Sequence, residues 1–142
     1  MKTVFADTAY WAGIASPHDR YHEAAVQARD LLGPARVVTT EEVLCEFLAL
    51  LREGGGSVRA HAVAMVRRVL RNPNVDVVPQ THDSFLSGLE LYGKRLDKEY
   101  SLTDCISMNV MRERGITQVL TTDHHFEQEG FRVLIQSAGG AS

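Results

Sequence analysis

The stretch SLTDCISMNVMRERGITQVLTTDHHF, residues 101–126, predicts a helix followed closely by a strand. We expect the helix over residues 103–114, ending at Gly115, a common residue after a helix C-terminus. The β-type run 118–122 then ends directly at an acid, Asp123. A helix that returns the chain to a strand is the repeating unit of an α/β fold.

The same alternation continues through the rest of the chain. Strands are expected at residues 3–6, 36–39, 76–79 and 132–135, and helices at 9–15, 22–32, 41–53, 58–70 and 82–96. Such alternation predicts crossovers between parallel strands. We therefore predict an α/β fold: a three-layer α/β/α sandwich with a central, mostly parallel sheet. Residues 1–136 would form one domain and residues 137–142 a flexible tail.

Two local patterns belong to the third helical run. Val43, Phe47, Leu50 and Leu51 follow the spacing of one buried helical stripe. The segment GGGS, residues 54–57, predicts a break between two helices. It lacks the lysine of a nucleotide-binding GxxxxGK[ST] loop, so we interpret it as a connector.

Composition excludes several classes of protein. The net charge of −3 argues against binding nucleic acid through bulk attraction. Cys45 and Cys105 have no CxxC spacing, which disfavours a zinc knuckle or a disulfide framework and fits a reducing compartment. We interpret both as small core residues. An early acid argues against a signal peptide, and no apolar run reaches the ~18 residues of a membrane span. A soluble, cytoplasmic protein without membrane contact is expected.

Four acids are candidates for chemistry, and each has an ordinary structural explanation to weigh. Asp7 and Asp123 directly follow strands, where either could simply cap the next helix. Asp104 matches the capping-box spacing with Ser101. Glu46 lies within a helix where no cap explains it, with Glu42 as a rival and Glu41 as a weaker one.

The conjunction of these acids is more informative than any one of them. Acids at the ends of parallel strands emerge at the same sheet edge, where ligands bind in such folds. Clustered carboxylates raise one another's pKa unless a cation compensates them. Mg²⁺ and Mn²⁺ prefer oxygen ligands, and they serve phosphodiester hydrolysis. The sequence therefore predicts a metal-dependent hydrolytic site.

These residues, in this order, resemble the PIN domain, and most closely the VapC-type toxin ribonucleases of toxin–antitoxin pairs. The resemblance covers Val4 to about Ile135 and is most specific over residues 101–126. It implies an endoribonuclease that depends on Mg²⁺ or Mn²⁺, forms homodimers and is silenced by a small antitoxin encoded nearby.

Carried over by position, four acids match the catalytic cluster of that family. The metal would be held mainly by Asp7, Asp104 and Asp123, with Glu46 orienting the attacking water. Possible supporting residues are Thr8, Thr122, Ser101 and His125, and His22 matches a histidine that often opens the second helix.

The sequence departs from the pattern of the family at one position, two residues after Asp123. Many relatives carry an acid or Asn where this chain has His125. We expect His125 to be a phosphate contact at the cleft and His124 to face solvent. Arg52 and Arg112 are candidates for positioning phosphates at the rim. Tyr10 and Trp11 are expected to pack in the core rather than to stack on RNA.

Two other functions are compatible with the same residues. A PIN nuclease could process RNA without being a toxin, which the neighbouring genes would decide. A PIN-like chain could also keep its acids while serving as an idle RNA- or protein-binding module. In that case Asp7→Asn would leave RNA degradation unchanged.

Overall fold

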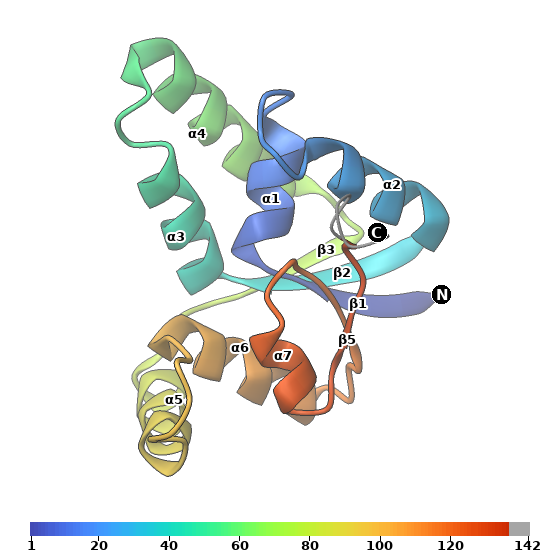
Figure 1. The fold of residues 1–142 in the computed structure, drawn as a ribbon. Coiled ribbons are helices and arrows are strands. Elements are labelled where there is room, and N and C mark those ends of the chain that lie inside the picture. The colour runs from blue at the N-terminus through green and yellow to red at the C-terminus, as the bar shows by residue number, and fades with distance from the viewer. Residues whose placement is uncertain (137–142) are drawn as a thin grey trace.

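The computed structural model describes residues 1–136, so the predicted tail 137–142 lies outside the described residues. A single sheet of five parallel strands, in the order β3-β2-β1-β4-β5, forms the centre of the molecule (Figure 1). The strands are β1 (Lys2–Ala6), β2 (Ala35–Thr40), β3 (Val75–Val78), β4 (Gln118–Leu120) and β5 (Arg132–Val133).

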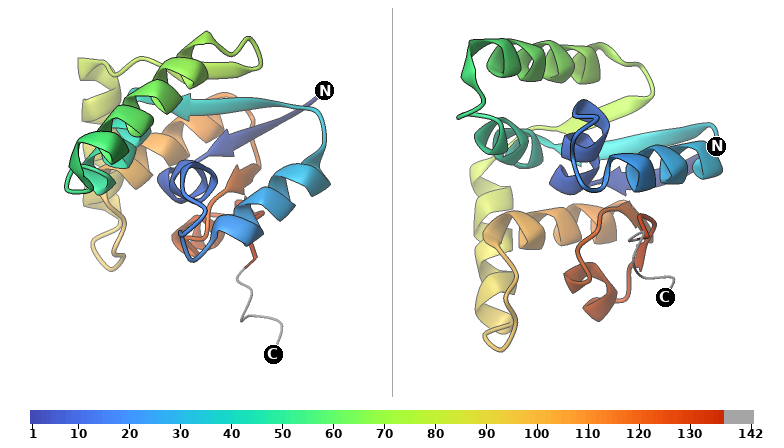
Figure 2. Two further views of the ribbon diagram at one scale, coloured as in Figure 1. Left: turned by 90° about the horizontal axis from the view of Figure 1, so that it is seen from above. Right: turned by 45° about the horizontal axis from the view of Figure 1, so that its top comes forward.

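Helices cover both faces of this sheet, which confirms the predicted α/β/α sandwich. Figure 2 shows α1 to α4 on one side and α5 to α7 on the other. Crossovers between parallel strands are right-handed, so reversing the direction of travel across the sheet changes the face that the helices cover. The helices are α1 (Thr8–Ala15), α2 (His22–Leu32), α3 (Glu41–Leu50), α4 (Gly55–Arg71), α5 (His82–Lys94), α6 (Leu102–Glu113) and α7 (His125–Gln128).

The central strand is fully enclosed between the two helical layers. Val4, Phe5 and Ala6 of β1 have no exposed surface, and Val119 of β4 is equally buried. A strand covered on both faces is apolar along its whole length rather than alternating. This burial explains why the central strand β1 is apolar up to Ala6, so that an acid, Asp7, stands only where the strand ends.

The order of the strands creates a reversal point at β1. The chain passes from β1 to β2 and β3 in one direction, then returns to place β4 on the other side of β1. The backbone N–H of Asp7 donates to the carbonyl of Leu120, 3.1 Å away, just where the two strands end. Ligands of parallel sheets bind beyond the carboxyl ends of strands at such a reversal.

Several expectations for the α3–α4 region are wrong. The predicted break at residues 54–57 contains the first turn of α4, because Gly55 adopts a positive φ of 88° and redirects the chain there. Leu50 is 62% exposed, and Leu44 is buried beside Val43 and Phe47 instead. Cys45 is exposed rather than a core residue, whereas Cys105 is buried as expected.

The last part of the chain also departs from expectation. The predicted strand 118–122 ends at Leu120, and the short helix α7 was not anticipated. The strand stops early because Thr121 uses its side chain, rather than a strand ladder, to bond the following backbone. The expected core positions of Tyr10 and Trp11 are confirmed.

Within the described residues, none of the helices is both long enough and apolar enough to cross a membrane.

Candidate active site

Asp7 connects β1 to α1 and is almost completely buried, with 6% of its surface exposed. It occupies the N-cap position of α1, yet its side chain makes no capping hydrogen bond. Its Oδ2 atom instead accepts a hydrogen bond from the Thr121 hydroxyl, 2.8 Å away at the end of β4. The capping explanation for this acid therefore does not hold.

The electrostatic setting of Asp7 is unfavourable to its charge. The pKa of Asp7 is raised from 3.8 to about 7, chiefly by burial, and the negative charges of Asp104 and Glu46 contribute to this rise. Hydrogen bonds from the Thr8 backbone and the Thr121 hydroxyl oppose this rise without cancelling it. A buried carboxylate among other carboxylates favours protonation or a nearby cation.

Asp104 both caps a helix and faces the other acids. Its Oδ2 accepts from the Ser101 backbone N–H and the Ser101 hydroxyl accepts from the Asp104 N–H, each at 3.0 Å. Burial raises the pKa of Asp104, and the charges of Asp123 and Glu46 add to that effect. The predicted capping box is confirmed, and it holds the carboxylate at the sheet edge.

Asp123, in the loop that leads from β4 to α7, and His125, the first residue of α7, lie beside Asp104. The Thr121 hydroxyl accepts from the Asp123 N–H at 3.1 Å, and Asp123 Oδ1 accepts from the His125 N–H at 2.9 Å. The His125 Nδ1 atom lies 3.1 Å from Asp123 Oδ1 and 3.9 Å from Asp104 Oδ2. One ligand atom from each of the three residues falls within 4.8 Å of the others.

Glu46 reaches the same cluster from the middle of α3. The Thr8 hydroxyl donates to its Oε1 atom at 2.7 Å, which fixes the carboxylate next to Asp7. The two other acids of α3 that were considered for this role lie elsewhere. Glu41 accepts a hydrogen bond from the Gln80 backbone N–H at 2.7 Å, and Glu42 lines a separate hollow together with residues of α5 and α6. Glu46 is thus the α3 acid that joins the cluster.

The predicted supporting residues divide into those at the cluster and those elsewhere. Thr8, Ser101 and His125 contact the acids directly. Thr121, rather than the proposed Thr122, supplies the hydroxyl that bonds Asp7. His22 lies outside the site, since its Nδ1 bonds the Gly13 carbonyl at 2.7 Å and joins α2 to α1.

The charged and histidine candidates at the rim have mostly structural contacts. His124 is 75% exposed at its side chain, as expected, and lies 3.2 Å from Glu127. Arg52 donates to the Ala49 carbonyl at the end of α3. Arg112 is paired with Glu129 at 2.7 Å. Neither arginine is positioned by these contacts to hold a phosphate.

A second cluster next to the acids was not anticipated from the sequence. Glu129, with 5% of its side chain exposed, bonds Arg95 at 2.9 Å, Arg112 at 2.7 Å and the Tyr100 hydroxyl at 2.9 Å. Its hydrogen bond with Arg95, above all, lowers the pKa of Glu129 to about 2. Tyr100 also packs edge-on against His125, with ring centroids 5.4 Å apart. No sequence motif links Glu129 to its partners, because they lie 17 to 34 positions away from it.

The residues of the acidic cluster fit a divalent cation. The donors are mainly carboxylate oxygens, which suit Mg²⁺ and Mn²⁺. Asp7 is buried with a raised pKa, and the charges that act on it, from Asp104 and Glu46, are both negative, so its ionised form would be stabilised by a cation. The buried Nδ1 atom of His125 also has no hydrogen-bond partner among the described residues. Both features are those of a site organised around a cation.

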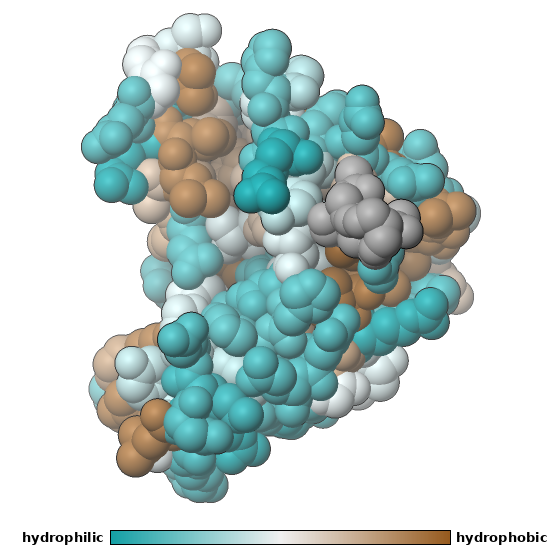
Figure 3. Space-filling model, viewed as in Figure 1, coloured by the Kyte–Doolittle hydropathy of each residue, from teal (hydrophilic) through white to brown (hydrophobic). Residues whose placement is uncertain are grey.

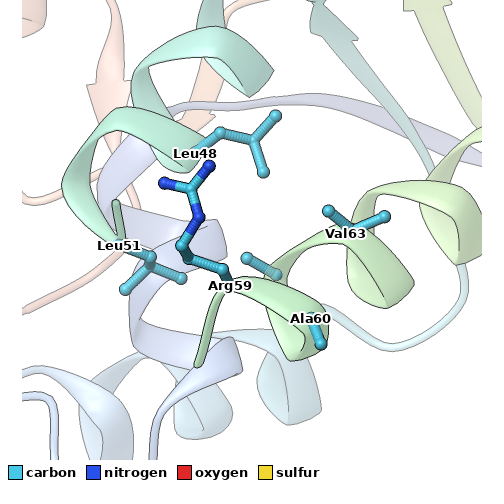
Figure 4. Close-up of a pocket in the computed structure, with 6 residues that line it drawn as sticks. Leu48, Leu51, Arg59, Ala60 and Val63 are labelled. Carbon is cyan, nitrogen blue, oxygen red and sulfur yellow. The ribbon is translucent and has the colours of Figure 1, made fainter. Parts of the chain in front are cut away.

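An apolar pocket lies apart from the acids, between α3 and α4 (Figure 4). Its lining is Leu48, Leu51, Arg59, Ala60, Ala62 and Val63. Hydrophobic residues are also prominent on the surface over these helices in Figure 3. The pocket contains no carboxylate or histidine, so it cannot perform the chemistry expected of the acidic cluster.

Known proteins with a similar sequence or fold agree with this architecture. The model of the PIN domain family matches residues 4–131. The 23S rRNA-specific endonuclease VapC20 of Mycobacterium tuberculosis is 32% identical over 130 residues, covering 90% of this chain and 95% of that protein.

Solved structures give the same picture. The crystal structure of M. tuberculosis VapC20, described as a sarcin-ricin loop cleaving toxin, matches with a TM-score of 0.79 and 29% identity, covering 90% of this chain and 95% of that one. FitAcB from Neisseria gonorrhoeae shares the fold, with a TM-score of 0.60 and 15% identity over 92% of this chain and 96% of that one. The chain belongs to the PIN domain family and, within it, to the VapC-type proteins.

Proposed function

We propose that this chain is a metal-dependent endoribonuclease and the toxin of a toxin–antitoxin pair. The observation that carries the proposal is the convergence of four carboxylates at the reversal point of the sheet, around a buried Asp7 whose pKa is raised to about 7. The similarity to a 23S rRNA-specific endonuclease supports RNA as the substrate and the cytoplasm as the location.

Asp7, Asp104 and Asp123 would hold the cation, which we propose to be Mg²⁺ or Mn²⁺. When bound, the cation would polarise a phosphate oxygen and stabilise the negative charge of the departing oxygen. Thr121 and Ser101 orient two of these carboxylates through the hydrogen bonds described above. Their role is to keep the donor oxygens in place before the substrate arrives.

Glu46 would act on the attacking water. Its carboxylate is fixed by the Thr8 hydroxyl at one oxygen, Oε1, which leaves Oε2 to accept a hydrogen bond from water. A carboxylate that accepts a proton from water at the moment of attack increases the nucleophilicity of that water. The phosphodiester bond would then break on the side opposite the attacking oxygen.

The charge balance of the chain does not favour RNA binding through bulk attraction. Its net charge is −3, and Arg112 is already paired with Glu129. We therefore propose that affinity depends on the metal site and on the shape of a structured RNA loop, rather than on bulk charge. A ribosomal RNA fragment that contains a structured loop is the first substrate to test.

Exposed apolar surface supports the proposed protein partners. The α3–α4 pocket, with Arg59 at its edge, would accept an apolar antitoxin segment that carries an acidic residue (Figure 4). The exposed side of α5, with Phe85, Leu86, Leu89 and Tyr92, would pair with a second copy of the chain. Co-purification from the native operon and measurement of the molar mass in solution test these two assignments.

A cleavage assay tests the enzymatic proposal directly. The purified chain should cut a structured ribosomal RNA fragment in Mn²⁺ or Mg²⁺, and EDTA or Asp104→Asn should abolish cutting. The side-chain amide that this substitution introduces can still accept the bond from the Ser101 backbone, so the helix cap is kept. Asp30→Asn, at an exposed and distant acid, serves as the matched control.

The outcomes separate the alternatives. Cutting that persists in EDTA and in Asp104→Asn would contradict the metal-dependent mechanism. Cation binding without cutting of any RNA would indicate an idle binding module. Cutting without arrest of growth on expression, and without rescue by a neighbouring short reading frame, would indicate an RNA-processing nuclease.

A further inference from the structure

Among the residues that the structure describes, His125 is the one side chain at the acidic cluster that offers a nitrogen rather than an oxygen. Its Nδ1 atom points among the carboxylates, 3.1 Å from Asp123 Oδ1 and 3.9 Å from Asp104 Oδ2. Although the first distance is short, the direction is wrong for a hydrogen bond, and Oδ1 already accepts from the His125 backbone N–H. The nitrogen is therefore buried beside two anionic oxygens without a hydrogen-bond partner among the described residues.

The orientation of the His125 ring is fixed by its contact with Tyr100. Tyr100 packs edge-on against it, with an interplanar angle of 60° and only 4% of the tyrosine exposed. The Tyr100 hydroxyl donates to Glu129, which is fixed in turn by Arg95 and Arg112. Because these contacts already fix the ring, the imidazole would lose little freedom on binding a ligand.

The three donor atoms have the separation of ligands to one ion. Two ligand atoms at about 2.1 Å from a common centre lie about 3 Å apart when adjacent and about 4 Å apart when opposite. The distances of 3.1 Å and 3.9 Å from Nδ1 to the two carboxylates fall at these values. The exposed part of the ring, 29% of the side chain, is free to carry the proton on Nε2.

We propose that His125 Nδ1 is a direct ligand of the cation, together with Asp104 and Asp123, and that this mixed site selects Mn²⁺ over Mg²⁺. The inference rests on the proposed metal-dependent function. Mg²⁺ takes oxygen ligands almost exclusively, whereas imidazole nitrogen suits transition metals. A chain with an acid at this position would present an all-oxygen site, so the histidine changes which ion is preferred.

Pulsed electron paramagnetic resonance of Mn²⁺ added to the intact chain tests the ligand. A directly bound imidazole transfers electron spin to its nitrogen, so the wild-type spectrum should contain the ¹⁴N coupling. The coupling should disappear in His125→Asn and remain in His124→Asn, whose side chain lies at the adjacent, exposed position. Bound Mn²⁺ without ¹⁴N coupling in the wild type would overturn the inference and leave the proposed nuclease site intact.

Calorimetric titration of the same proteins tests the selectivity. His125→Asn should weaken Mn²⁺ binding by at least about tenfold and change Mg²⁺ binding by no more than about threefold. His125→Asp should favour Mg²⁺ relative to the wild type. Equal changes for the two ions would overturn the inference, and absence of Mn²⁺ binding to the folded wild-type chain would overturn the proposed function as well.

Discussion

Asp7 and Glu129 are both acids withdrawn from solvent, but the charges around them have opposite signs. Glu129 is bonded by two arginines and a tyrosine hydroxyl, which lower its pKa to about 2. Asp7 is bonded by a threonine hydroxyl and faces two further acids, and its pKa is raised to about 7.

This difference separates a structural acid from a functional one. The charge of Glu129 is satisfied by residues of the chain, so its cluster stabilises the α5–α6 connection and α7 without any ligand. The charge of Asp7 is only partly offset by hydrogen bonds from the Thr8 backbone and the Thr121 hydroxyl, and the charges of Asp104 and Glu46 that act on it are both negative. Carboxylates with such strongly raised pKa values are often found at functional sites. Substitutions at the two sites should therefore have opposite effects on stability.

Asp7→Asn should lower RNA cleavage more than any substitution at the Glu129 cluster. The amide keeps an acceptor for the Thr121 hydroxyl but loses the negative charge that holds the cation. RNA cleavage should fall by two orders of magnitude or more, measured as the initial rate in Mn²⁺. Glu129→Gln should retain more activity than Asp7→Asn, and the reverse order would contradict the division between the two acids.

The same Asp7→Asn variant should be more stable than the wild type when no divalent cation is present. The folded-state pKa of Asp7 is raised, so folded protein binds the proton more tightly than unfolded chain between pH 3.8 and about 7. Wild-type stability therefore decreases through this window, because the carboxyl of the unfolded chain ionises while that of the folded protein keeps its proton. The advantage of the variant should grow from near zero at pH 4 to at most about 4 kcal/mol above pH 7.

Denaturant titration of both proteins in EDTA, from pH 4 to pH 8, measures that difference. Taking the difference between variant and wild type cancels the titration of other groups that the two share. A variant that is less stable than the wild type at pH 8 would show that the Asp7 charge is compensated within the protein.

A bound divalent cation should offset part of the destabilisation that the ionised carboxylates of the acidic cluster cause. At pH 7.5, Mn²⁺ at about 100 times its dissociation constant should stabilise the wild type by about 3 kcal/mol. The corresponding rise in melting temperature should be lost in Asp104→Asn and kept in Glu129→Gln. A rise of equal size in Asp104→Asn would place the cation elsewhere.

Glu129→Gln should destabilise the chain by about 1–3 kcal/mol at pH 7. This loss is smaller than the one expected for a fully buried ion pair, because the side chains of Arg95 and Arg112 are partly exposed. The folded-state pKa of Glu129 is lowered, so its contribution is present above pH 4.5 and is lost as pH falls toward about 2. Denaturant titrations at pH 7 and pH 3 should show a smaller difference at the lower pH. A difference that does not depend on pH would argue against an ionic contribution.

The smallest expected effect is that of Thr8→Val, which removes the donor to Glu46 without changing the shape of the side chain. One hydrogen bond contributes about 1 kcal/mol, which corresponds to about fivefold in the cleavage rate. Thr117→Val, at an exposed threonine outside the site, is the matched control. Equal rates for both variants would remove Thr8 from the mechanism.

Local patterns were sufficient to predict much of the fold and part of the site. Strands covered on both faces are continuous apolar runs, so Asp7 and Asp123 stand out where those runs end. The Ser101–Asp104 box is a short-range motif and was recognised as such. The GGGS segment does lie where two helices meet, but α4 begins within it at Gly55, whose positive φ the glycine pattern alone could not locate.

The remaining features depend on contacts between distant segments. Thr121 differs from Thr122 only in the direction of its side chain, which is determined by where β4 ends. The packing of α5, α6 and α7 brings together Tyr100, Glu129, Arg95 and Arg112. Sequence periodicity cannot predict these contacts, because it describes only residues that are close along the chain. The position of His125 beside two carboxylates follows from the unanticipated turn into α7.

Anomalous scattering from crystals grown with saturating Mn²⁺ would locate the cation itself. A peak is expected between the carboxylates of Asp7, Asp104 and Asp123, and it should be absent from crystals of Asp7→Asn or Asp104→Asn. A peak elsewhere, or none at these carboxylates in the wild type, would contradict the proposed metal site.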